Sequence, residues 1–213
     1  MIKIIETLDL TVNGLRLGKN QKVHLRQGEL DGACAVYSLM MYLIIIRVFT
    51  YKQVIDGDFD QRKSKGRIFR EFFESQDGLI RKGLDFAKDI QDGLRFAAKS
   101  LVKCVHIESR EETLKTLVEC VNNNTPLMIG IDYNKYSGHA LLAIGYEMIN
   151  DKVTKIYCLD PGCSIDTSSY WNAIIRIDDY VNAKYRDSYI TSDGNVKNVL
   201  VCDALKIEKR DKK

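Results

Sequence analysis

Proline is scarce in this sequence, and no stretch combines serine, glycine and proline in the manner of a flexible linker. Only two prolines occur among 213 residues. A chain of this length is close to the size at which one domain buries about 70% of its unfolded surface. We therefore expect a single domain over residues 1–213, with a charged tail at 206–213 that frays.

An excess of one charge and a long apolar run are also missing. The formal net charge is only +3, which by itself does not indicate a nucleic-acid partner. The most apolar segment, 33–46, is shorter than the roughly 20 residues that span a bilayer. The first ten residues, MIKIIETLDL, have none of the features of a signal peptide. We expect a cytoplasmic protein with six free thiols that binds neither nucleic acid nor membrane.

Motifs for nucleotides, metals and a serine nucleophile are absent as well. GxxxxGK[ST], HExxH and GxSxG do not occur. One acidic segment starts like a calcium loop, but Gln61 stands where the glycine belongs and Arg67 where the bidentate glutamate belongs. Cys158 and Cys163 with His139 match no standard zinc spacing. We therefore expect neither a metal nor a cofactor.

The first half of the chain carries mostly helical periodicity. Apolar side chains on nearly every face predict a buried helix from Cys34 to about Val48. Two further helical stretches lie near 67–75 and between 79 and 98, where glycines could interrupt the second.

The second half changes to strands. A capped helix from Ser109 through Val121 follows the first of them, and Asn150-Asp151 is a hairpin signal. The expected strands are 101–107, 126–133, 139–149, 152–160, 171–177 and 196–207. The pattern predicts an α+β fold: a helix-rich N-terminal half whose central, Cys-bearing helix packs on a C-terminal antiparallel sheet.

Cys34 and His139 are the candidate nucleophile and base. Cys34 opens the buried helix, where unpaired N–H groups and the helix dipole favour a thiolate; the alternative is a cysteine that merely packs in the core. Of three histidines, His24 lies in a charged extended segment and His106 shares a strand face with Cys104. His139 differs from both, because it follows Ser137-Gly138 at the mouth of an apolar strand.

Gln27 and Asp160 complete the candidate site. Gln27 lies seven residues before Cys34, and its carboxamide could donate to a developing oxyanion together with the Cys34 N–H. Asp160 ends the strand that pairs with the strand of His139. Counting outward from the Asn150-Asp151 turn brings Asp160 beside His139, where a carboxylate can orient the imidazole.

The order Gln27, Cys34, His139, Asp160 on these elements resembles the papain-like cysteine peptidases. With GHALLAIGY followed by LDPG, the chain is most similar to the bacteriocin-processing branch, which cleaves double-glycine leaders. The resemblance covers about residues 20–165. It implies a papain-like fold and a cysteine-peptidase activity.

We therefore expect a thiol-dependent hydrolase that cleaves a peptide or isopeptide bond in a peptide or protein substrate through an acyl-enzyme on Cys34. An acyltransferase or transglutaminase-like enzyme would share the Cys-His-Asp order. A catalytically silent papain-like fold, acting as a binding, immunity or adaptor protein, is the alternative from another class. The seven-residue spacing between Gln27 and Cys34 is the main support for that alternative, whereas the presence of Gln27 favours hydrolysis over acyl transfer.

Overall fold

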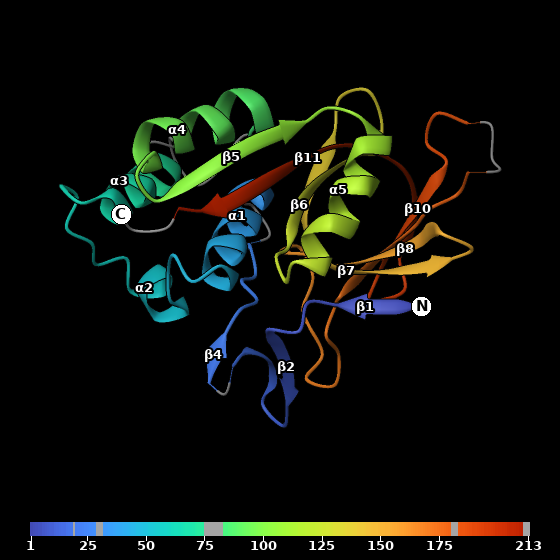
Figure 1. Cartoon of the computed structure of the whole chain (residues 1–213), viewed down its shortest axis with the longest axis horizontal. Helices are drawn as coiled ribbons and strands as arrows, with labels where there is room; N and C mark the ends of the chain where they lie inside the picture. Colours follow the sequence, from blue (N-terminus) through green and yellow to red (C-terminus); the bar gives the residue numbers. More distant parts are fainter. Residues whose placement is uncertain (19, 29–31, 75–82, 180–182, 211–213) are drawn as a thin grey trace.

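The computed structural model describes residues 1–18, 20–28, 32–74, 83–179 and 183–210 of a mixed α/β protein with a sheet-rich core (Figure 1). The helices are α1 (Cys34–Ile45), α2 (Tyr51–Asp56), α3 (Ser64–Phe69), α4 (Asp92–Ala98) and α5 (Arg110–Asn122), with two π-helical turns, η1 (Arg70–Glu74) and η2 (Phe86–Gln91). The strands are β1 (Ile2–Ile4), β2 (Leu8–Thr11), β3 (Gly14–Leu17), β4 (Gln21–Lys22), β5 (Val102–Ile107), β6 (Leu127–Asp132), β7 (Gly138–Ile149), β8 (Lys152–Leu159), β9 (Ala173–Arg176), β10 (Asp187–Thr191) and β11 (Val196–Lys209).

The main sheet closes on itself. Its strands follow the order β1-β7-β6-β11-β10-β9-β8, and β7 also pairs with β8, while β5 extends the sheet from β11. Every strand pairing in the described residues is antiparallel. Closure leaves few free strand edges. The short strands β2, β3 and β4 form a separate three-stranded sheet.

Helix α1 is the buried helix that the sequence predicts, and it begins at Cys34 as expected. Residues 35–45 are almost entirely buried, and the helix packs on β7 and β6 (Figure 1). The Tyr42 hydroxyl donates to the Ile207 carbonyl and accepts from its N–H, both at 2.9 Å. The helix ends at Ile45 rather than near Val48, because Arg47 adopts a left-handed backbone with φ of 60°.

The prediction of a helix-rich N-terminal half is wrong. The chain begins with four strands, none longer than four residues, and such short strands show little periodicity. Helices α2, α3 and α4 and the two π-helical turns are five to seven residues long. Of the helical stretches expected at 67–75 and 79–98, residues 75 and 79–82 lie outside the described part of the chain. Gly93 does not interrupt α4, where an added Cβ would lie 2.9 Å from the Phe72 ring.

The prediction that residues 206–213 fray is also wrong for the described part of the tail. Lys206 to Lys209 belong to β11 and pair with Val105 to Val102 of β5. Ile207 is 1% exposed, and its burial ties this charged segment to the core. Residues 211–213 lie outside the described residues.

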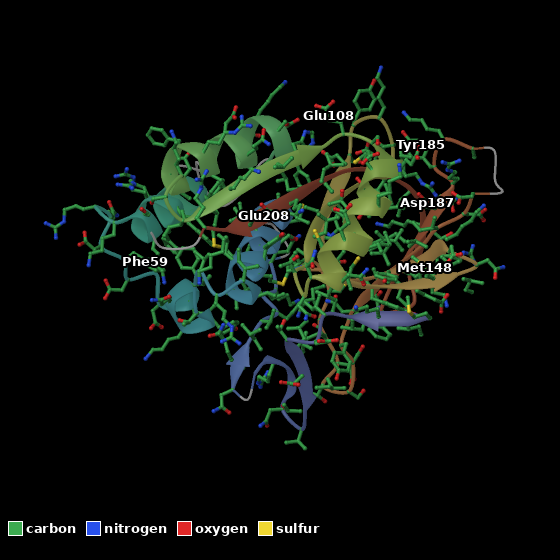
Figure 2. All side chains as sticks on the ribbon, in the orientation of Figure 1. Phe59, Glu108, Met148, Tyr185, Asp187 and Glu208 are labelled. Atoms are coloured by element: carbon green, nitrogen blue, oxygen red, sulfur yellow. The ribbon has the colours of Figure 1, made fainter. Side chains whose placement is uncertain are left out.

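The second half agrees well with the sequence. Strands β5 to β9 and β11 match the expected segments, and Asn150 and Asp151 both have positive φ in the turn between β7 and β8. Ser109 caps α5 by accepting the Glu112 N–H at 3.2 Å. Strand β10 is not predicted. It begins at the fully buried Asp187, which Figure 2 labels. Arg110 of α5 donates to both carboxylate oxygens of Asp187, at 2.8 and 3.0 Å.

Candidate active site

The Cys34 thiol lies where α1 meets β7. Its Sγ accepts the Ala140 N–H at 3.4 Å. Burial alone would raise the pKa of this thiol. A hydrogen bond and the positive charge of His139, together with the N–H groups of Ala140 and Ala35, outweigh burial and lower the pKa below its ordinary value. His139 and Ala140 of β7 thus contribute more to the lowered pKa than does the Ala35 N–H at the start of the helix.

His139 and Asp160 form a close pair beside Cys34. The Nε2 of His139 lies 2.7 Å from Oδ1 of Asp160, and the two side chains are 12% and 1% exposed. Burial opposes the charge on His139, but hydrogen bonds to Asp160 and Cys34 raise its pKa to about 9. This geometry favours a thiolate next to an imidazolium that a carboxylate holds in orientation.

Asp160 is held by donors on both carboxylate oxygens. Oδ1 also accepts the Gly162 N–H at 2.7 Å, and Oδ2 accepts the hydroxyl of Tyr189 on β10. Burial would raise the pKa of Asp160, yet His139, Tyr189 and the Gly162 N–H bring it down to about 2. The carboxylate thus stays ionised and fixed in direction.

Asn172 and His24 hold the turn that carries Asp160. The buried Asn172 side chain accepts the Asp160 N–H at 2.6 Å and donates to the carbonyls of Asp160 and Cys163 at 2.8 and 2.9 Å. His24 Nε2 lies 2.9 Å from the Asp160 carbonyl and 3.2 Å from Nδ2 of Asn172. These contacts fix the backbone rather than the reacting atoms.

Sequence reasoning missed Tyr189, Asn172 and the role of His24. Tyr189 lies on the strand that was not predicted. Asn172 had one usable signal, because a polar residue at the start of the apolar segment WNAIIRI is expected to find hydrogen-bond partners when it is buried.

Gln27 is the least integrated of the four predicted site residues. Its N–H donates to the Pro161 carbonyl at 2.9 Å, which brings its backbone next to the Asp160 turn. Its side-chain oxygen is buried and has no hydrogen-bond partner among the described residues. Residues 29–31, which link Gln27 to the start of α1, lie outside the described part of the chain.

A cavity of about 280 Å³ opens at the Cys34–His139 pair. It is lined by the end of β6, the start of β7, the bulged middle of β11 and residues 83–86. The reacting atoms are therefore accessible from a hollow that can receive part of a substrate. No group of three or more potential metal ligands occurs in the described residues, and no helix among them is long and apolar enough to cross a membrane.

Comparisons with known proteins add little. No family model and no curated protein matches the chain. Among solved structures, it is similar to the crystal structure of UfSP from C. elegans, with 15% identity and a TM-score of 0.42. The match covers 99% of this chain and 34% of that one, so this chain spans about a third of the length of UfSP.

Proposed function

We propose that this protein is a thiol-dependent hydrolase of the papain-like type that cleaves a peptide or isopeptide bond. The contact chain from Cys34 through His139 to Asp160, at the edge of an open cavity, carries the proposal. A nucleophile, a base and a group that orients the base are the three parts that acyl transfer on a thiol requires.

The reaction follows from these roles. The Cys34 thiolate attacks the carbonyl carbon, and the electron pair of the C=O bond moves onto oxygen. Collapse of this intermediate breaks the C–N bond, while the His139 imidazolium gives its proton to the departing amine. Water then attacks the thioester carbonyl while His139 takes a proton from it. The C–S bond breaks, which releases the acid product and regenerates the Cys34 thiolate.

The oxyanion would be stabilised by the Cys34 N–H and by Gln27. The backbone of Gln27 lies beside the Asp160 turn, and its buried amide oxygen lacks a partner among the described residues. A carboxamide NH₂ group is a donor of the kind that stabilises an oxyanion. The bacteriocin-processing branch is the specific relationship that we propose, on the GHALLAIGY and LDPG segments.

Two other functions give different products. In an acyltransferase, an amine would replace water in the second step, so added amines would divert product from the acid. A silent scaffold would form no thioester at all. The low pKa of the Cys34 thiol favours an enzyme over the scaffold, because a packing cysteine needs no thiolate.

The decisive experiment incubates the purified protein with a proteome-derived peptide library and reads new termini by mass spectrometry. Cleavage should occur with the wild type and with Cys120→Ala, whose thiol is buried in α5. It should be lost with Cys34→Ala, and acid quenching of the wild type should trap an acyl group on Cys34. Cleavage that persists without Cys34, or no cleavage by any preparation, would refute the proposed function.

A further inference from the structure

The cavity beside Cys34 has walls of two kinds. Leu84 and Phe86 supply apolar surface. Asp132 at the end of β6 and Asp203 on β11 supply carboxylates. At about 280 Å³, the space lies just below the usual range of about 300–1,000 Å³ for small-molecule sites. It therefore suits one substrate side chain better than a whole small ligand.

The sheet is shaped to bring Asp203 to this cavity. The register of β11 against β6 shifts between Val201 and Asp203, which leaves Cys202 as the extra residue of a bulge. A bulge changes the direction in which nearby side chains point. Asp203 pairs with Gly130 in β6, and a Cβ on Gly130 would lie only 2.0 Å from Oδ1 of Asp203. The glycine and the bulge together make room for this carboxylate.

A second glycine does the same for Asp132. A Cβ on Gly138 would lie 2.9 Å from Oδ1 of Asp132. Gly138 directly precedes His139, so the carboxylate of Asp132 lies close to the residues that would act on the substrate. Glycine within a strand commonly marks a place where another group approaches the backbone closely.

The negative charge of this pair is only partly compensated. Burial and the nearby Asp203 carboxylate raise the pKa of Asp132, with Lys184 opposing them. No ion pair to Asp132 occurs within the described residues. Of the two carboxylate oxygens of Asp203, Oδ2 lies 3.0 Å from Nε2 of His106 and Oδ1 accepts a hydrogen bond from the Cys202 thiol at 3.2 Å.

We propose that this cavity binds a lysine or arginine side chain of the peptide substrate, and that Asp132 and Asp203 determine this specificity. A long cationic side chain matches both walls, because its methylene stem packs on apolar surface while its head binds carboxylates. A metal ion is a poorer occupant, since no group of three potential metal ligands occurs in the described residues. The inference rests on the proposed function, because it concerns the substrate of the same site.

The test uses the cleaved-peptide library again. Lysine and arginine should be enriched at one position within about three residues of the cleaved bond. At that position, a peptide with arginine should have a kcat/KM about 10- to 100-fold higher than its citrulline twin, which is neutral and has nearly the same shape. That range corresponds to hydrogen bonds to a charged group.

Asp132→Asn and Asp203→Asn should each reduce the arginine-to-citrulline ratio. Glu208→Gln should not, because Glu208, labelled in Figure 2, lies on the same strand as Asp203 but does not line the cavity. Its side chain is 51% exposed and pairs with Lys206. If Asp203→Asn, which loses the ion pair with His106, does not fold, Asp132→Asn and the wild-type ratio still decide the matter. Cleavage without a basic preference, or with a preference that both variants retain, would overturn this inference alone. Absence of any cleavage would refute the proposed function beneath it.

Discussion

Alkylation of Cys34 by iodoacetamide near pH 6 probes the proposed thiolate–imidazolium pair directly. An ordinary cysteine, with a pKa of about 8.5, is only about 0.3% thiolate at pH 6. Because His139 lowers the pKa of Cys34 in spite of burial, the thiolate fraction can rise by up to about 300-fold. Lower basicity weakens the intrinsic nucleophilicity, with a Brønsted slope of about 0.4–0.5. These two effects together allow Cys34 to react up to about tenfold faster than free cysteine.

The other five thiols serve as internal references. Burial raises the pKa of Cys104 and Cys163 to about 12 and also raises the pKa of Cys120, Cys158 and Cys202. A thiol with a pKa of about 12 is roughly one-millionth thiolate at pH 6. Mass spectrometry of timed digests should therefore find Cys34 modified first. In urea, where the fold is lost, the six thiols should react at similar rates.

The variant His139→Ala removes the cause of this reactivity. Burial then dominates at Cys34, so labelling at pH 6 should fall and the pH profile should move upward. The wild-type fold is fully stabilised by His139 at the assay pH of 6. The folded-state pKa of His139 is about 9, above the ordinary value of about 6.5. The contribution of His139 to the free energy of unfolding is therefore complete below about pH 6.5 and is lost as the pH rises through 9. Wild-type reactivity in the folded variant, or earlier labelling of Cys158 or Cys163, would refute the assignment.

Three further predictions concern residues around the site and in the core. Gln27→Ala should slow acylation by about 10²–10³-fold. Labelling of Cys34 by iodoacetamide should remain nearly unchanged, because alkylation forms no oxyanion. An equal decrease in the acylation rate and the labelling rate would indicate a structural role for Gln27. Tyr189→Phe removes a donor to Asp160, so the free energy of unfolding should fall by about 1–3 kcal/mol. Because Tyr189 lowers the pKa of Asp160, the acid limb of the pH–activity profile should move to higher pH in the variant. An unchanged acid limb would contradict this role. Arg110→Ala leaves the buried Asp187 without its ion pair, so the free energy of unfolding measured in urea should fall by about 3–5 kcal/mol. Lys115→Ala removes an exposed ion pair on the same helix and should lower it by less than about 1 kcal/mol. Equal losses in the two variants would refute the reasoning.

The sequence predicts the parts of the site that depend on long or regular elements. Cys34 begins a helix that is apolar on nearly every face, so this helix is expected in the core of the fold. The Asn150-Asp151 hairpin makes the strands of His139 and Asp160 neighbours, which is enough to bring these two residues together. Both follow from local signals, namely helical burial and a tight turn.

The rest depends on contacts between distant segments that local patterns do not encode. Tyr189 reaches Asp160 only because β10 pairs with β9 and β11. Strands β1 to β4 are too short for their periodicity to be read. The charged segment from Lys206 onward resembles a solvated tail, but it pairs with β5, and Ile207 within it is buried.

The link between Tyr42 and Ile207 has a consequence for biosynthesis. Tyr42 of α1 forms two hydrogen bonds to Ile207, which the ribosome adds 165 residues later. The two residues that most lower the pKa of Cys34, His139 and Ala140, belong to β7. On a nascent chain that has not yet reached those segments, Cys34 is an ordinary thiol with little thiolate at neutral pH. The lowered pKa of Cys34 requires His139 and Ala140 of β7, so the reactive thiolate forms only after these residues have been synthesised and have packed against the start of α1.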